Sequence, residues 1–172
     1  PALAFLCASL LIIGLFTLSP VEYSKLGKQA ASSVLYLSNI IYYRDSGYFA
    51  ESSLENWLLH TWSLSVEWQF YLLYPVALLV LNRLLSRDKL KVAIVFATFL
   101  SLVLSAWLTP KNPSLSYYVL PTRAWEMLVG GLAFLYPIKI YEALRKPLAV
   151  IGVILILISC FVFSEKTSWP GI

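Results

Sequence analysis

A polar stripe crosses an otherwise apolar segment near the middle of the chain. Between Leu58 and Pro75, five polar or titratable side chains return to one side of a helix with about 3.6 residues per turn. They are His60, Ser63, Glu67, Tyr71 and Tyr74. Such groups can exchange protons with a substrate or hydrogen-bond it. Because ionisable groups at membrane depth are costly unless paired or hydrated, we expect the stripe to face the bundle interior or a water-filled cavity.

The stripe admits two interpretations. Glu67 could hydrogen-bond neighbouring helices and serve only to hold them together. Ionisable groups inside a membrane more often mark substrate sites and proton pathways. We therefore favour a functional role for Glu67 and keep packing as the alternative.

A second polar block lies further along the chain. Arg123 and Glu126 are three residues apart, so they share a helix face, and Gly130 on the same face would let another helix approach closely. Arg123 could form an ion pair with Glu126 or Glu67 that fixes packing. It could instead bind an anionic group or stabilise the charge of a developing oxyanion. Both interpretations stay open at this point.

Composition indicates what must position these residues. Hydrophobic residues make up 59% of the 172 residues and charged residues only 13%, whereas a soluble domain carries about 25% charged residues. The net charge of +4 is therefore not a nucleic-acid signal, because basic residues of membrane proteins report loop orientation. Cys7 and Cys160 lie in apolar runs, so we expect packing residues and neither a disulfide nor a metal site.

The sequence predicts an all-α, polytopic transmembrane bundle that belongs to one domain over residues 1–172. About six segments are apolar enough to cross a membrane or nearly so. They are Ala2–Ser19, Ala30–Tyr43, Trp57–Leu81, Val92–Thr109, Tyr118–Tyr136 and Leu148–Phe163. The second is short and polar, so a re-entrant or interfacial helix is its alternative. We also expect further spans before Pro1 and a remainder after Ile172.

Basic residues support six crossings. Nine lie in one set of alternate loops and three in the other, a positive-inside pattern. It predicts that Arg87 and Arg145 face the cytoplasm and that Asn56, Asn112 and the end of the span carrying Arg123 face outward. In and directly before the outward loop 44–56, carboxylates and aromatic rings form either an aromatic belt or the rim of a site for a polar acceptor such as a sugar. These side chains are Asp45, Glu51, Glu55, Tyr42, Tyr43, Tyr48 and Phe49.

The run from His60 to Pro75 closely resembles the His-Thr-Trp-Ser-Leu-Ser-Val-Glu-Glu-Gln-Phe-Tyr-Leu-Leu-Tyr-Pro signature of the acyltransferase-3 family. The block from Arg123 to Gly131 is similar to that family's later Arg-x-Trp-Glu-Leu-x-x-Gly block. Upstream, Ser38-Asn39 and Gly47-Tyr48-Phe49 resemble two further family positions. One departure is Trp68, where the family usually has a second Glu, which makes Glu67 the better candidate for a role.

This resemblance implies a multi-pass enzyme of the bacterial inner membrane. Such an enzyme would transfer an acyl group, most often acetyl, from acetyl-CoA or another acyl-CoA to a hydroxyl of an extracytoplasmic carbohydrate. The acceptor would be O-antigen, lipopolysaccharide or another cell-surface glycan. Membrane lipid, the carbohydrate and acyl-CoA are then the partners, without nucleic acid or metal, and the oligomeric state stays open.

The candidate residues follow from the two blocks. We assign catalytic roles to Glu67 and Arg123, and we expect the family's main catalytic His upstream of this chain. Candidate substrate-binding residues are His60, Trp62, Ser63, Tyr71 and Glu126. A transporter or flippase for a polar or lipid-linked substrate is the alternative function, because midplane polar groups can also bind a substrate without changing it.

Overall fold

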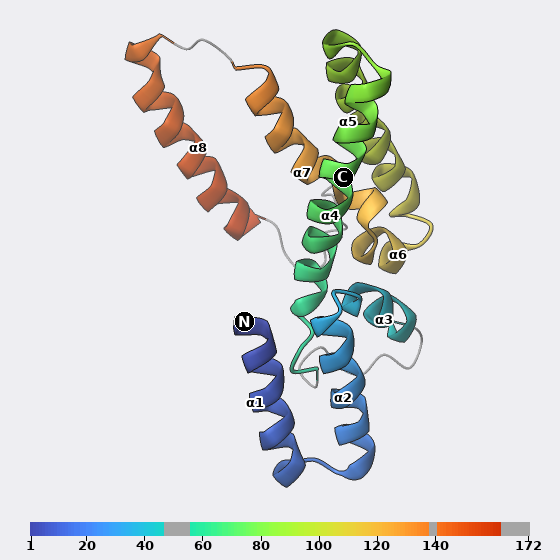
Figure 1. Cartoon of the computed structure of the whole chain (residues 1–172). Coiled ribbons are helices and arrows are strands. Elements are labelled where there is room, and N and C mark those ends of the chain that lie inside the picture. The colour runs from blue at the N-terminus through green and yellow to red at the C-terminus, as the bar shows by residue number, and fades with distance from the viewer. Residues whose placement is uncertain (47–55, 138–140, 163–172) are drawn as a thin grey trace. The chain divides into compact units, whose positions relative to one another are not determined.

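Residues 1–46, 56–137 and 141–162 are described by a computed structural model, and every regular element in them is a helix (Figure 1). The predicted all-α class is thereby confirmed for these residues. The helices are α1 (Ala2–Thr17), α2 (Pro20–Val34), α3 (Ser38–Asp45), α4 (Thr61–Leu84), α5 (Arg87–Leu108), α6 (Pro113–Tyr118), α7 (Leu120–Leu135) and α8 (Glu142–Val162). The chain forms two units, Pro1–Leu85 with Tyr118–Leu120 and Ser86–Tyr117 with Pro121–Ile172.

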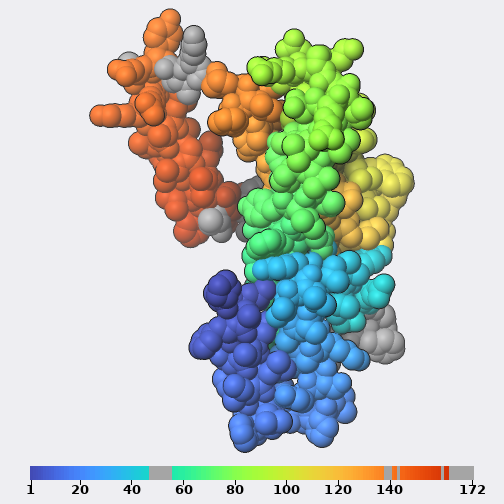
Figure 2. Space-filling view, in the orientation of Figure 1, coloured from blue at the N-terminus to red at the C-terminus, as the bar shows by residue number. Residues whose placement is uncertain are grey.

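The first unit begins with α1 and α2, whose side chains meet in the space-filling view (Figure 2). The reversal between the helices is fixed by a capping box. The Ser19 hydroxyl accepts from the Glu22 N–H, and the Glu22 carboxylate accepts from the Ser19 N–H at 2.8 Å. Cys7, Leu26 and Ala30 form a buried apolar cluster with Leu58. Cys7 is thus a packing residue, as predicted.

The helix predicted over Ala30–Tyr43 is wrong as a continuous element, because α2 ends at Val34 and α3 starts at Ser38. The chain leaves α2 through a Schellman motif, in which the Leu37 N–H bonds the Ser32 carbonyl at 2.8 Å and the Tyr36 N–H bonds the Ser33 carbonyl at 3.1 Å. Tyr36 takes the left-handed position that this motif requires, with a φ of 55°. Glycine usually fills that position. Because the chain has a tyrosine there, the break could not be predicted from the residue type.

Two helices in the described residues, α4 and α5, are long and apolar enough to cross a membrane. They match the segments predicted at Trp57–Leu81 and Val92–Thr109, each displaced by a few residues. The segments predicted at Ala2–Ser19, Tyr118–Tyr136 and Leu148–Phe163 also coincide with helices, α1, α7 and α8. The number of crossings stays a prediction.

In the second unit, α6 lies between α5 and α7 along the chain and is tied to α5. The Thr109 and Ser116 hydroxyls are 2.8 Å apart, and Asn112 accepts from the Leu115 N–H at the start of α6. Gly130 lies on α7, where the sequence predicted close approach of another helix. Among the described residues no heavy atom of a packing partner lies within 4 Å of the position of a Cβ there, so the close approach stays a prediction.

Many small polar side chains are buried, and many large apolar side chains are exposed. The most deeply buried side chains of the described residues are mainly small and polar, including Ser33, Ser65 and Thr122, each 0% exposed. Large apolar side chains such as Phe16 and Leu72 are exposed along the helices. Small hydroxyl residues between helices with apolar side chains outside are typical of helices embedded in lipid. The arrangement therefore agrees with the low charged content of the sequence.

Candidate active site

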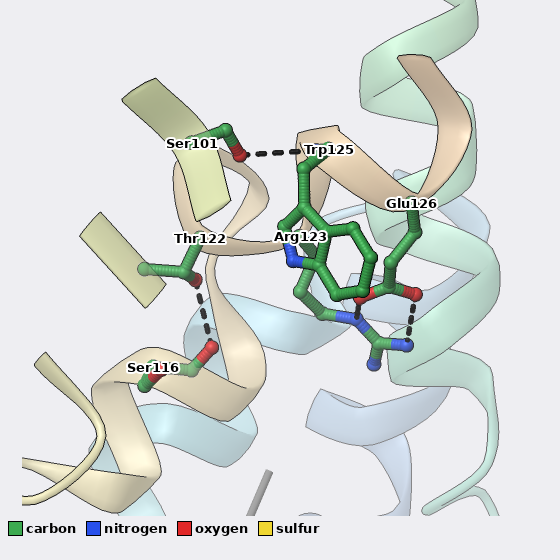
Figure 3. A network of polar contacts seen from close by, with 6 residues as sticks. All are labelled: Ser101, Ser116, Thr122, Arg123, Trp125 and Glu126. Carbon is green, nitrogen blue, oxygen red and sulfur yellow. Dashed lines mark hydrogen bonds and ion pairs between the residues drawn. The ribbon is translucent and has the colours of Figure 1, made fainter. Parts of the chain in front are cut away.

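Arg123 and Glu126 form the ion pair that their spacing predicted. Arg123 Nε lies 2.9 Å from Glu126 Oε1, and Arg123 Nη2 lies 2.9 Å from Glu126 Oε2 (Figure 3). Two parallel N–H···O bonds hold the guanidinium and the carboxylate in one plane, a more specific arrangement than a single contact. The side chains are 18% and 26% exposed. The pair is therefore partly shielded from solvent and fixed in direction.

The guanidinium of Arg123 also lies near an aromatic ring. Its Cζ is 5.8 Å from the centroid of the Tyr117 ring, within the range where a cation is attracted to the face of a ring. Tyr117 belongs to α6, directly before the turn into α7. The end of α6 and the first turn of α7 thus orient one cation, which could bind an anionic group or a developing negative charge.

The start of α7 is held by buried hydroxyl groups that sequence reasoning missed. The Thr122 hydroxyl donates to the Ser116 carbonyl at 2.7 Å, and the Ser101 hydroxyl of α5 contacts the backbone of α7 (Figure 3). A signal existed in the sequence, because Thr98, Ser101, Ser105 and Thr109 recur every three or four residues and all are buried. Such a stripe of hydroxyl groups marks the packed face of α5.

The polar stripe of α4 lies on the side away from its packed face. His60, Glu67 and Tyr71 are exposed, and Ser63 and Tyr74 are half-buried. At about 3.6 residues per turn, these residues lie nearly opposite the buried residues of α4, namely Thr61, Trp62, Ser65 and Val66. The described helices leave the stripe unpacked, and the expectation that it faces the bundle interior or a water-filled cavity stays a prediction.

The packed face of α4 carries a chain of buried hydroxyl groups. Thr61 Oγ1 lies 2.7 Å from Ser33 Oγ and 3.2 Å from Ser38 Oγ, and Ser38 Oγ lies 2.7 Å from Ser65 Oγ. All four side chains are buried. The chain joins α4 to the end of α2 and the start of α3, and it fixes the face that α4 turns outward.

Among the predicted substrate-binding residues, Trp62 differs from the others. It is 7% exposed, and its ring meets the Tyr118 ring edge-on with centroids 5.2 Å apart. Trp62 is a packing residue in this conformation, whereas His60 and Tyr71 are exposed on the other side of the helix. Of the proposed acceptor rim in loop 44–56, residues 47–55 lie outside the described residues.

No three His, Cys, Asp or Glu side chains gather in residues 1–46, 56–137 and 141–162. The chemistry open to the described residues is that of an oriented guanidinium, a carboxylate and hydroxyl groups. Such groups stabilise charge and transfer protons.

The described residues form helices with exposed apolar side chains, and Arg123 in the first turn of α7 is held in a fixed direction by Glu126. A family model described as an acyltransferase domain matches residues 2–171. The chain belongs to this acyltransferase family, the acyltransferase-3 family that its two sequence blocks resemble. No solved structure matches it.

Two curated relatives show the extent of the similarity. The peptidoglycan O-acetyltransferase OatA of Listeria monocytogenes is 33% identical over 94% of this chain and 27% of its own length. An uncharacterized protein of Haemophilus influenzae is 27% identical over 88% of this chain and 66% of its own length. The chain thus spans less than two thirds of either relative.

Proposed function

We propose that the chain is part of a membrane O-acyltransferase that moves an acyl group, acetyl in the first instance, from acyl-CoA to a hydroxyl of a cell-surface glycan. Family membership over residues 2–171 supports acyl transfer. The Listeria relative is named a peptidoglycan O-acetyltransferase, which supports acetyl as the group and a glycan as the acceptor class. The basic residues in alternate loops support a glycan-facing side outside the cytoplasm.

The observation that carries this proposal is the forked ion pair of Arg123 and Glu126. Acyl transfer places a negative charge on the carbonyl oxygen in its transition state, and an oriented cation in a water-poor site stabilises that charge. A partly buried arginine held in one plane by a carboxylate is prepared for this task before the substrate arrives. Glu126 then keeps Arg123 in place, and Arg123 contacts the reacting group.

The reaction proceeds by addition and elimination. A base removes the proton of the acceptor hydroxyl, and the oxygen attacks the thioester carbonyl carbon while the carbonyl electron pair moves to oxygen. The guanidinium of Arg123 stabilises this oxyanion. When the carbonyl re-forms, the C–S bond breaks, and the CoA thiolate leaves and takes up a proton. Glu67 is proposed separately from Arg123 as a carboxylate that transfers protons.

The test replaces Arg123 by Lys in the full-length protein in membranes, with ¹⁴C-acetyl-CoA as donor and the glycan of the same membranes as acceptor. Lys keeps the charge but cannot form the two-bond fork. We expect transfer to fall about a hundredfold, the typical effect of losing a group that stabilises transition-state charge. Arg87→Lys, at an exposed position at the start of α5, is the matched control and should be silent.

Normal membrane insertion is required of both variants, measured by the amount of protein in the membrane. If Arg123→Lys kept more than about half of the parent activity, Arg123 would only extend its charge to water at the membrane interface, a role that Lys can also fill. The catalytic assignment of Arg123 would then be withdrawn.

A further inference from the structure

The Ser101 hydroxyl bridges two backbone groups of the first turn of α7. Its Oγ donates to the Pro121 carbonyl at 2.6 Å. It also accepts from the Trp125 N–H at 3.0 Å (Figure 3). In a regular helix, the N–H of residue 125 would bond directly to the carbonyl of residue 121. A side chain from α5 therefore takes part in the hydrogen-bond ladder of α7 at this turn.

The bridged turn is the one that carries the proposed catalytic cation. Residues 121 and 125 flank Arg123, and Glu126 follows directly after. A side chain inserted into a helix ladder changes the local direction of the helix. Ser101 therefore sets how this turn is oriented relative to α5, and with it the direction in which Arg123 leaves the backbone.

A second contact restrains the same turn from the other side. Thr122 is 0% exposed, and its hydroxyl donates to the Ser116 carbonyl at 2.7 Å. Tyr117, whose ring lies near the guanidinium, directly follows Ser116. The hydroxyl groups of Ser101 and Thr122 thus fasten the backbone on both sides of Arg123.

We infer that Ser101 is a positioning residue for acyl transfer, which acts through the first turn of α7 on Arg123. This inference rests on the proposed function of Arg123. The rival explanation is that Ser101 only holds α5 and α7 together, as small hydroxyl residues commonly do between membrane helices. If Ser101 positions Arg123, its loss lowers the rate per folded molecule. If Ser101 only holds the helices together, its loss leaves that rate unchanged.

The chain offers a matched control one turn along the same face. Ser105 is 0% exposed, and no described residue hydrogen-bonds its hydroxyl. The Ser105 contacts to Thr109 and Ser116 use its backbone carbonyl, which alanine keeps. Ser101→Ala and Ser105→Ala therefore delete the same atom from the same helix face, but only the first deletes a bridge to α7.

The experiment uses the full-length protein in detergent micelles, with two readouts. Hydrogen exchange, followed by mass spectrometry, reports on the backbone amides of residues 120–127. Steady-state kinetics with acetyl-CoA as donor reports kcat and KM. In Ser101→Ala we expect the amide exchange rates of this segment to differ from those of the parent. We also expect kcat to fall about tenfold, because a 1 Å misplacement of a catalytic group can cost about a hundredfold and a smaller displacement should cost less. The KM for acetyl-CoA should change little.

Ser105→Ala should leave both readouts at the parent values, and Ser101→Thr, which keeps a hydroxyl, should restore most of the lost kcat. Combined with Arg123→Lys, Ser101→Ala should cause little further loss, because both changes act on one group. An unchanged exchange pattern, or an unchanged kcat per folded molecule, would overturn positioning by Ser101. If the parent protein transfers no acetyl group while the exchange pattern still responds, the proposed function fails and the structural bridge stands.

Discussion

Gln69 donates a hydrogen bond from Nε2 to the side-chain oxygen of Asn39 at 2.8 Å, and this contact fastens α4 to the first turn of α3. The same Nε2 donates to the Tyr36 carbonyl at 2.9 Å, and Asn39 Nδ2 donates to the Tyr118 carbonyl at 3.0 Å. Gln69 thus satisfies a backbone carbonyl at the break between α2 and α3, and Asn39 satisfies a carbonyl at the end of α6. Buried polar groups of this kind are stabilising only while every member keeps its partner.

Replacing Gln69 by Leu should therefore lower stability strongly. The substitution leaves the Asn39 oxygen and the Tyr36 carbonyl without this donor, and each unsatisfied buried group costs about 1–3 kcal/mol. The melting temperature of the detergent-solubilised protein measures the effect. Ser63→Ala, on the opposite side of α4, is the control and should change the melting temperature little. Equal melting temperatures for Gln69→Leu and the parent would show that the amide pair carries no stability.

The position of this amide pair shows what sequence reasoning missed. Thr61, Ser65 and Gln69 recur every four residues, as regularly as the stripe that contains Glu67. We predicted the buried face of α4 from its titratable side chains, including Glu67. Hydroxyl and amide groups cost less free energy to bury than a carboxylate, because they need no counter-charge. The packed face of α4 is therefore the one that carries uncharged hydroxyl and amide groups.

Other features could be predicted because they are local. The Arg123–Glu126 pair needs only a helix and a spacing of three, and α1, α4 and α5 need only apolar length. The break between α2 and α3 depends on the left-handed conformation of Tyr36, which cannot be predicted from a tyrosine. The Ser101 bridge joins two helices, so the periodicity of neither helix reveals it.

Substitutions at Tyr36 should separate the backbone from the ring. The left-handed conformation costs an ordinary residue about 1–2 kcal/mol that glycine does not pay. The Tyr36 ring stacks on Trp68 with centroids 4.6 Å apart, which offsets part of this cost. Tyr36→Gly and Tyr36→Ala both remove the ring, but only Gly relieves the backbone. We expect Tyr36→Gly to melt at a higher temperature than Tyr36→Ala, and the reverse order would contradict the Schellman motif.

The topology prediction can be tested by thiol labelling in a variant with Cys7 and Cys160 replaced by Ala. Cys at Arg87 or Arg145 should resist an impermeant thiol reagent in cells whose outer barrier is opened, because the basic loops are expected inside. Cys at Lys111 should react. Lys111 is exposed and precedes Asn112, whose side chain caps α6 and is better left intact. Labelling at Arg87→Cys without labelling at Lys111→Cys would reverse the orientation.

The last prediction concerns Glu67, an exposed carboxylate on a helix long and apolar enough to span a membrane. None of the hydrogen bonds or ion pairs found among the described residues involves its side chain. A role limited to packing between the described helices would require such a contact. A charged group on a membrane helix is costly unless water or another partner solvates it, so we expect Glu67 to face a hydrated, substrate-accessible space.

Glu67→Gln keeps the shape of the side chain and removes its charge and its ability to accept a proton. We expect acetyl transfer to fall about a hundredfold, the lower range for loss of a group that transfers protons, with the amount of inserted protein unchanged. Glu67→Asp, which keeps a carboxylate on a shorter side chain, should retain more activity than Glu67→Gln. Glu142→Gln, at an exposed position in the first turn of α8, is the matched control and should behave like the parent. If activity and protein amount fell together in Glu67→Gln, the role of Glu67 would be packing. If activity per molecule stayed at the parent value, Glu67 would have no part in the reaction.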